Sequence, residues 1–191
     1  MDKSGENEVQ DLSIPIPSAY GAMLVIVGPL TALLTTGHIL IWGAENFFSG
    51  LNNFLRWESL LPTLVLGIPL HEFIHGATWA VTGRKTLKDI HFGFQWKSLA
   101  PYAHLKVPVQ AGAYRAGAIM PALILGLMPY LIGMASGSAW FTAFGLFYIF
   151  AAGGDLVVLW LLRNVDGDTL VEDHPSRAGC YVYAQGLKIE N

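Results

Sequence analysis

Residues 61–81 read "LPTLVLGIPLHEFIHGATWAV", a stretch apolar and long enough to cross a lipid bilayer as one helix. Near its middle stand three ionisable residues, His71, Glu72 and His75. Ionisable side chains inside a membrane span are costly and mark functional sites by default. The stretch therefore predicts a transmembrane helix whose polar residues serve a site rather than the fold.

The composition of the chain also indicates a membrane protein. Of its 191 residues, 53% are hydrophobic and 13% are charged, and the mean hydropathy is +0.45. A soluble domain is about one-quarter charged, and here long apolar runs alternate with short polar ones. The net charge of -3 gives no indication of a nucleic-acid partner. The one cysteine, Cys180, excludes an internal disulfide and a cysteine-built zinc site.

Four segments are each long enough to span about 30 Å of hydrocarbon as a helix, which takes roughly 20 residues. They lie at about residues 20–43, 60–82, 117–135 and 139–162. The fold class we expect is an all-α membrane protein with about four transmembrane helices in a core of residues 20–162. A polar N-terminal tail of residues 1–19, without the features of a signal peptide, and a C-terminal tail of residues 163–191 flank this core.

The basic residues predict how the spans are oriented. Four spans place the N-terminal tail, a long loop at about residues 83–116 and the C-terminal tail on one side of the membrane. That side carries ten of the eleven lysines and arginines, and the other side carries only Arg56. Loops rich in lysine and arginine face the cytoplasm, so we expect both termini and the long loop to be cytoplasmic.

The long loop contains a strand-like pattern. In "DIHFGFQWK", residues 89–97, apolar and polar side chains alternate, and "YAHLKV", residues 102–107, can return beside them after a turn. This alternation with aromatic residues is typical of a β-strand with one apolar face. We expect a small β-hairpin at about residues 89–107 on the cytoplasmic face, between the second and third spans. It either caps the membrane face or holds an extended peptide along its edge at about residues 90–96.

His71, Glu72 and His75 form the pattern H-E-x-x-H. Residues i and i+4 of a helix lie one turn apart on the same face, so both imidazoles can bind one metal ion. Zinc is the expected metal, a single ion, because it accepts imidazole nitrogen with carboxylate oxygen and keeps a position for water. Glu72 would be the catalytic residue, taking a proton from metal-activated water and returning it to a leaving amine. The alternative is a hydrogen-bonded cluster between helices.

A third metal ligand is expected from the fourth span, where Asp155 is the only charged residue. His75 and Asp155 each lie seven residues before the inner end of their span, so at 1.5 Å per residue both sit roughly 10 Å from that end. Small residues at 151–154 would let this helix approach the second span closely near Gly76. The alternative is that Asp155 reaches the interface or pairs with Arg163.

Other polar residues are weaker candidates. His91 and His104 fall on the polar face of the expected hairpin, where solvated histidines are common. Asp173 and His174 either form a turn in the C-terminal tail, which is the simpler interpretation, or fold back to the site. His38, alone in the first span, is expected to bond to a neighbouring helix.

On these motifs the chain resembles the site-2-protease class of intramembrane metalloproteases, and more closely a family of small bacterial and archaeal membrane proteins known as zincin peptidases. The resemblance rests on "HEFIH" in the second span, "GGD" in the fourth, and the aromatic hairpin followed by "AGAIMPALILG". It covers about residues 60–175 and implies one zinc ion bound by His71, His75 and Asp155, with Glu72 as general acid/base. It also implies a prokaryotic plasma-membrane protein that cleaves peptide bonds in or next to a transmembrane segment.

The chain departs from the larger class in several respects. Its aspartate follows two glycines rather than lying in an Asn-Pro-Asp-Gly setting, its third span has Pro121 but no asparagine, and the sequence shows no PDZ-like segment. In the larger class an asparagine of this span often helps to polarise the scissile carbonyl. The group that stabilises the oxyanion therefore stays open, and the candidates for it or for substrate contacts are Tyr102, His104 and Tyr148.

The expected function is that of a zinc-dependent intramembrane or juxtamembrane endopeptidase of membrane-protein substrates. Its expected partners are the lipid bilayer and a transmembrane or membrane-proximal protein, with no nucleic acid; the sequence indicates no oligomeric state. The alternative is a non-catalytic membrane zinc-binding protein with a structural, sensing or transport role. Glu72 favours the enzyme, because a structural site needs no base and closes all four positions. The matched broken helices typical of transporters are not found in the sequence.

Overall fold

The computed structural model describes residues 9–95 and 100–183. Its helices are α1 (Ile16–Trp42), α2 (Ala44–Phe54), α3 (Trp57–Thr82), the short η1 (Leu87–Asp89), α4 (Ala111–Pro121), η2 (Ala122–Leu127), α5 (Met128–Ser136), α6 (Ala139–Ala151) and α7 (Gly153–Leu161). Its strands are β1 (Val9–Ile14), β2 (Ile90–Gln95), β3 (Ala100–Leu105), β4 (Val109–Gln110), β5 (Leu170–Asp173) and β6 (Ala178–Tyr183). The chain is therefore mostly helical, with short strands before, between and after the long helices in the sequence.

Three helical segments are long and apolar enough to cross a membrane. They are α1, α3 and the continuous segment Ala111–Ser136, which joins α4, η2 and α5. The helices α6 and α7 meet at a bend of 46° and are not one straight helix. If this bent pair crosses the membrane as one span, it adds a fourth crossing. The four expected spans therefore correspond to three helical segments and one bent pair.

The bend between α6 and α7 is packed against α1. A Cβ atom at Gly153 would lie 2.2 Å from Cγ of Met23, so only glycine permits this approach. The expectation that residues 151–154 allow a close approach to α3 at Gly76 is therefore wrong. Gly76 packs instead against Phe92 of β2, whose ring atom Cζ would lie 2.5 Å from a Cβ there. Gly153 of this turn serves the contact between α7 and α1, whereas a Cβ at Gly154 would meet nothing within 4 Å.

The close neighbour of α3 is α4. A Cβ atom at Gly117 of α4 would lie 2.0 Å from Nε1 of Trp79, so the absence of a side chain lets the two helices meet. The indole N–H of Trp79 donates to the carbonyl oxygen of Tyr114 over 3.0 Å. This contact brings the backbone of α4 against the face of α3 that carries the two histidines.

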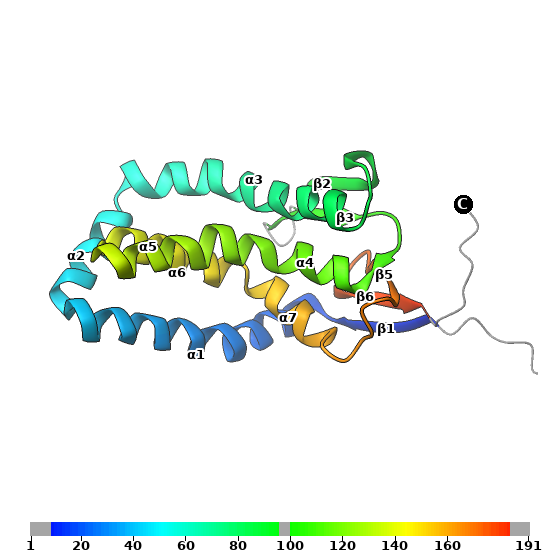
Figure 1. Ribbon diagram of the computed structural model, residues 1–191, viewed down its shortest axis with the longest axis horizontal. Helices are drawn as coiled ribbons and strands as arrows, with labels where there is room; N and C mark the ends of the chain where they lie inside the picture. Colours follow the sequence, from blue (N-terminus) through cyan, green and yellow to red (C-terminus); the bar gives the residue numbers. More distant parts are fainter. Residues whose placement is uncertain (1–8, 96–99, 184–191) are drawn as a thin grey trace, which may run out of the picture.

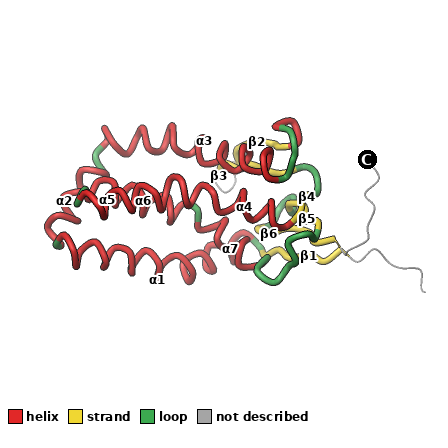
Figure 2. The backbone as a smooth tube through the Cα atoms, viewed as in Figure 1, coloured by secondary structure: helices red, strands yellow, loops and turns green. Residues whose placement is uncertain are grey.

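Figure 1 and Figure 2 show the strands gathered at one end of the helix bundle, with α2 at the opposite end. β2 pairs with β3 antiparallel, from Ile90↔Leu105 to Gln95↔Ala100. The alternating pattern therefore predicted two strands that exist and pair with each other. Trp96 and Lys97, which belong to the same pattern, lie outside the described residues.

A second sheet corrects the all-α expectation. It has four strands in the order β1-β6-β5-β4, and three of them come from the segments expected to be tails. Ile14 of β1 pairs with Ala178 of β6. Partners so far apart in the sequence leave no local signal of their pairing, and strands this short show little periodicity. The described parts of both tails are therefore joined in one folded layer.

Cys180 lies in the core where the helices meet the sheets. This core joins Trp79 of α3, Leu105 of β3, Val171 of β5 and Cys180 of β6. Cys180 is fully buried, and burial raises the pKa of its thiol to about 12.

The thiolate is the reactive form of cysteine, so we predict that iodoacetamide at pH 8 leaves the folded protein unlabelled and labels it after denaturation. Mass spectrometry of the intact chain measures the label. Rapid labelling of the folded protein would contradict the burial of Cys180 in β6.

Candidate metal centre

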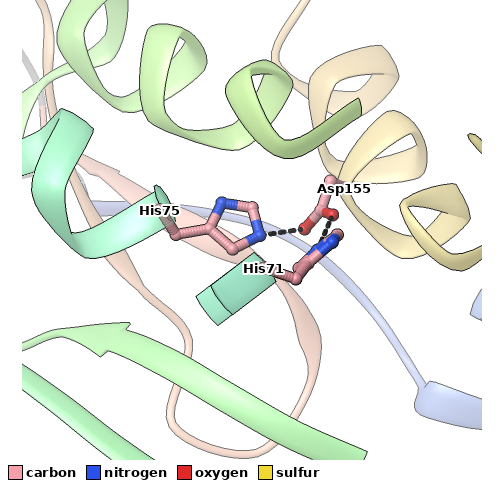
Figure 3. A group of neighbouring side chains, drawn as sticks. All are labelled: His71, His75 and Asp155. Atoms are coloured by element: carbon pink, nitrogen blue, oxygen red, sulfur yellow. Dashed lines mark hydrogen bonds and ion pairs between the residues drawn. The ribbon is translucent and has the colours of Figure 1, made fainter. Parts of the chain in front are cut away.

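Two successive turns of α3 and the first turn of α7 bring three metal-binding side chains together (Figure 3). Nε2 of His71 lies 3.3 Å from Oδ2 of Asp155, and Nε2 of His75 lies 3.4 Å from Oδ1. One ligand atom from each residue belongs to a group whose members all lie within 4.8 Å of one another. Both histidines are buried. The three expected ligands are therefore neighbours in the structure.

His75 is oriented by a backbone carbonyl of α4. Its Nδ1–H donates to the carbonyl oxygen of Gly117 over 2.9 Å, which leaves the lone pair of Nε2 for a metal ion. In a regular helix this carbonyl accepts from the N–H four residues later, but that residue is Pro121, which has no N–H. The next N–H, of Ala122, donates to Ile119. Pro121 thus frees the acceptor that fixes the tautomer of His75.

Replacing Pro121 by alanine gives the helix an N–H that competes for the Gly117 carbonyl. We predict that Pro121→Ala weakens zinc binding about 10- to 100-fold, the range found when partners of metal-binding histidines are changed. Pro29→Ala, at a proline inside α1, is the control and should keep the wild-type affinity. Competition with a chromophoric chelator measures the affinity. Equal affinities in both variants would show that Pro121 does not orient His75.

The three side chains fit zinc. Imidazole nitrogen binds zinc at about 2.0–2.1 Å and carboxylate oxygen at about 2.0–2.2 Å, so neighbouring ligands of a tetrahedral ion lie about 3.3 Å apart. The two histidine nitrogens lie 3.3 and 3.4 Å from different oxygens of the Asp155 carboxylate, and one ligand atom from each residue lies within 4.8 Å of the others, so the group is compact enough to surround one ion. Three protein ligands with one open position are typical of catalytic zinc sites, whereas structural sites use four.

The metal-binding group opens into a cavity of about 570 Å³. Glu72 lines the same cavity without belonging to the ligand group, and the backbone N–H of Ala103 in β3 donates to its carboxylate. The other walls come from the start of α1, from β3, α4 and α7, and from the turn between β5 and β6. A carboxylate beside the ligand set, in a space that admits water, has the placement that a general base requires.

His71 is held by an aromatic neighbour. Its ring lies 6.5 Å from that of Tyr148, centroid to centroid, at an angle of 23°. The Tyr148 hydroxyl donates to the carbonyl oxygen of Thr63 over 2.7 Å, and Gly67 leaves room for it, because a Cβ there would lie 1.6 Å from the oxygen. Tyr148 is not among the residues that line the cavity. Its position suits support of His71 rather than the contact with substrate expected for it.

Comparison with known proteins agrees with this geometry. Residues 64–170 match the model of a family described as "Putative zincin peptidase". The chain belongs to this family. The match includes His71 and His75 of α3 and Asp155 of α7, so the whole ligand group lies inside it. The family description implies zinc as the metal. No curated protein and no solved structure gave a significant match.

In this zincin peptidase family member, several other candidate residues reach the cavity without joining the ligand group. Among the described residues, the weaker candidates that line the cavity but lie outside the group are Tyr102, His104, His91, Asp173 and His174. Tyr102 and His104 are therefore placed where a substrate contact is possible. The turn expected at His174 is present, since the backbone N–H groups of Ser176 and Arg177 donate to its Nδ1 atom.

The contacts of Arg163 and His38 decide between the roles that the sequence allows for these two residues. Arg163 lies over the ring of Trp160 and donates to its carbonyl oxygen, so it is not the partner of the aspartate. His38 is bonded to Thr142 of α6 and to Asn46 of α2, each over 2.9 Å. It joins three helices, as expected for a polar residue between spans, and does not line the cavity.

Proposed function

We propose that this protein is a zinc-dependent endopeptidase that cuts membrane-protein substrates within or next to a transmembrane segment, in the manner of site-2 proteases. The observation that carries the proposal is the meeting of His71, His75 and Asp155 with Glu72 at one cavity. Membership of the zincin peptidase family supports a zinc-dependent peptidase. Long apolar helices around the cavity support a substrate that lies in the bilayer.

Each residue of the centre has a separate task in this proposal. His71, His75 and Asp155 hold the zinc ion, which when bound supplies a Lewis acid and lowers the pKa of water to about 7. Glu72 accepts the proton of the attacking water and gives it to the leaving amine. The bond from Nδ1–H of His75 to the Gly117 carbonyl keeps Nε2 unprotonated for the ion.

An extended substrate segment can lie along the edge of β3 that faces Glu72, where it would compete with the Asp173 and Glu72 carboxylates for the backbone N–H groups of that edge. The N–H of Leu105 donates to Asp173 rather than to β2, and the N–H of Ala103 donates to Glu72. Alternate residues of a strand direct their backbone groups to the same edge, so the edge of β3 that faces Glu72 is the one not paired with β2. Strand addition there would present an unwound peptide to the cavity. We therefore place the substrate on β3, not along residues 90–96 of β2.

We further propose that the cavity end of the molecule faces the cytoplasm. Lys85, Lys106 and Arg177 lie in the loops and strands at the end of the bundle that carries the sheets, while Arg56 lies at the opposite end, just before α3 (Figure 1). This distribution supports the orientation through the preference of basic residues for the cytoplasmic side. Water would then reach the metal centre from the cytoplasm.

Reconstitution tests the proposed function. The zinc-loaded protein is placed in lipid vesicles with single-span proteins extracted from a bacterial plasma membrane, and new N-termini are mapped by mass spectrometry. We expect cuts within or next to the apolar spans that disappear when a chelator removes zinc and return when zinc is restored. Cuts confined to soluble domains would contradict the proposed substrate class. Full zinc occupancy without any cut would favour a non-catalytic zinc-binding protein.

A further inference from the structure

Asp173, the last residue of β5, is a buried carboxylate with donors from two other elements. The hydroxyl of Tyr114 in α4 donates to its Oδ1 atom, and the backbone N–H of Leu105 in β3 donates to Oδ2 over 2.7 Å. Nδ1 of His104 lies 3.7 Å from the same Oδ2 atom. Burial raises the pKa of the Asp173 carboxyl above its ordinary value. Burying a charged carboxylate costs free energy unless hydrogen bonds or an opposite charge compensate for the lost water.

The neighbours of Asp173 connect it to the metal centre. His104, Tyr114 and Asp173 all line the cavity of that centre. Tyr114 stacks on Trp79 with ring centroids 5.5 Å apart, and Trp79 stacks on His75 at 5.4 Å. Asp173 therefore joins β5 to β3 and α4 at the point where both approach the ligand-bearing helix.

We propose that Asp173 is a positioning residue that holds His104 in the cavity, and that His104 stabilises the negative charge of the scissile carbonyl oxygen during cleavage. The Asp173 carboxylate lies beside Nδ1 of His104, and an N–H at Nε2 of His104 would donate to the developing oxyanion. Within the described residues, no hydrogen bond or ion pair engages Nε2 of His104. The inference rests on the proposed function and selects His104 among the residues considered for this role.

The two rival residues lack this arrangement. The hydroxyl of Tyr148 is bonded to the carbonyl of Thr63 and is not available to a substrate. Tyr102 lines the cavity and lies beside the ring of His91, 6.0 Å between centroids, but no carboxylate holds it among the described residues. Among the described residues, His104 is the one of these three candidates whose polar atom lies beside a buried carboxylate.

Asp173 also lies outside the part of the chain that matches the family. The match ends at residue 170, and Asp173 follows in a strand that the sequence did not reveal. Pairing of β5 with β6, with Asp173 opposite Cys180, places the carboxylate against β3. The C-terminal sheet thus contributes to the site itself and is more than a cover for the end of the bundle.

Kinetics of single variants test the role of His104. With the substrate found in the vesicle experiment, we expect His104→Gln to lower kcat about 10²- to 10³-fold, as for loss of one oxyanion donor. KM should change less than about threefold and zinc content not at all. Asp173→Asn should lower kcat in the same direction, whereas Asp168→Asn, at an exposed carboxylate before β5, should leave it unchanged. Wild-type kcat in His104→Gln would overturn the proposal.

Nitrogen-15 NMR of the histidine rings tests the positioning separately from catalysis. The six histidines are labelled, and His104 is assigned by the signal that His104→Gln removes. We expect Asp173→Asn to shift the Nδ1 signal of His104, and Tyr114→Phe, which keeps the carboxylate, to shift it less. An unchanged His104 signal in Asp173→Asn would overturn the positioning role. A wild-type protein that cuts nothing would overturn the proposed function while this measurement still decides whether Asp173 holds His104.

Discussion

Glu72→Gln is expected to lower the rate of substrate cleavage about 10²- to 10⁴-fold, the usual contribution of a general acid–base group. Glutamine has nearly the size of glutamate and keeps an acceptor oxygen for the N–H of Ala103, but it cannot take a proton from water. Zinc content should stay at the wild-type level, because Glu72 lies outside the group formed by His71, His75 and Asp155. Cleavage in vesicles and metal analysis of the same sample measure both quantities.

Glu58→Gln is the matched control for this experiment. Glu58 lies in the first turn of the same helix, with a side chain that is 76% exposed, so its loss should change neither cleavage nor zinc content. Wild-type cleavage by Glu72→Gln would remove Glu72 from the mechanism. Loss of zinc in that variant would show instead that Glu72 supports the metal centre.

Asp155→Ala is expected to weaken zinc binding by more than about 100-fold, since changes to the outer partners of ligands alone cost 10- to 100-fold. The two imidazoles would be left as the only members of the ligand group, and two ligands do not complete the set of three that a catalytic zinc site uses. His71→Ala and His75→Ala should lose zinc in the same way. Equilibrium dialysis against buffered free zinc measures the affinities.

His91→Ala is the control for the ligand variants, because His91 lines the same cavity but lies outside the ligand group. It should keep the wild-type affinity. Undiminished zinc in Asp155→Ala would place the third ligand elsewhere in the cavity, and Asp173→Ala would then be the variant to examine. Equal losses in His91→Ala and Asp155→Ala would mean that zinc binding depends on the whole cavity rather than on three residues.

The meeting of His75 and Asp155 could be predicted from the sequence because two regular quantities determine it. Helical spacing puts His71 and His75 on one face of α3, and the rise per residue converts distance from the span end into depth. Asp155 stands at the matching depth, and its oxygens lie 3.3 and 3.4 Å from the two imidazoles. The bend of 46° between α6 and α7 was not predicted, because two adjacent glycines permit a turn without setting its direction.

The contacts that orient the centre depend on pairs far apart in the sequence. Asp173 reaches Leu105 only because β5 pairs with β6 next to the hairpin strand β3, and no local pattern encodes that approach. Gly117 and Pro121 were also missed as parts of the centre. A signal existed, because a proline four residues after a glycine in a span leaves one backbone carbonyl without its helical donor. The partner of that carbonyl, His75, could be known only once α3 and α4 were packed together.

Anomalous X-ray scattering at the zinc edge, from crystals of the zinc-loaded protein, locates the metal ion among these residues. We expect one zinc peak, about 2.0–2.2 Å from Nε2 of His71, Nε2 of His75 and a carboxylate oxygen of Asp155, with the Glu72 carboxylate beside it but not bound to it. A zinc peak at other residues, or a fourth bond from Glu72 that closes the site, would contradict it.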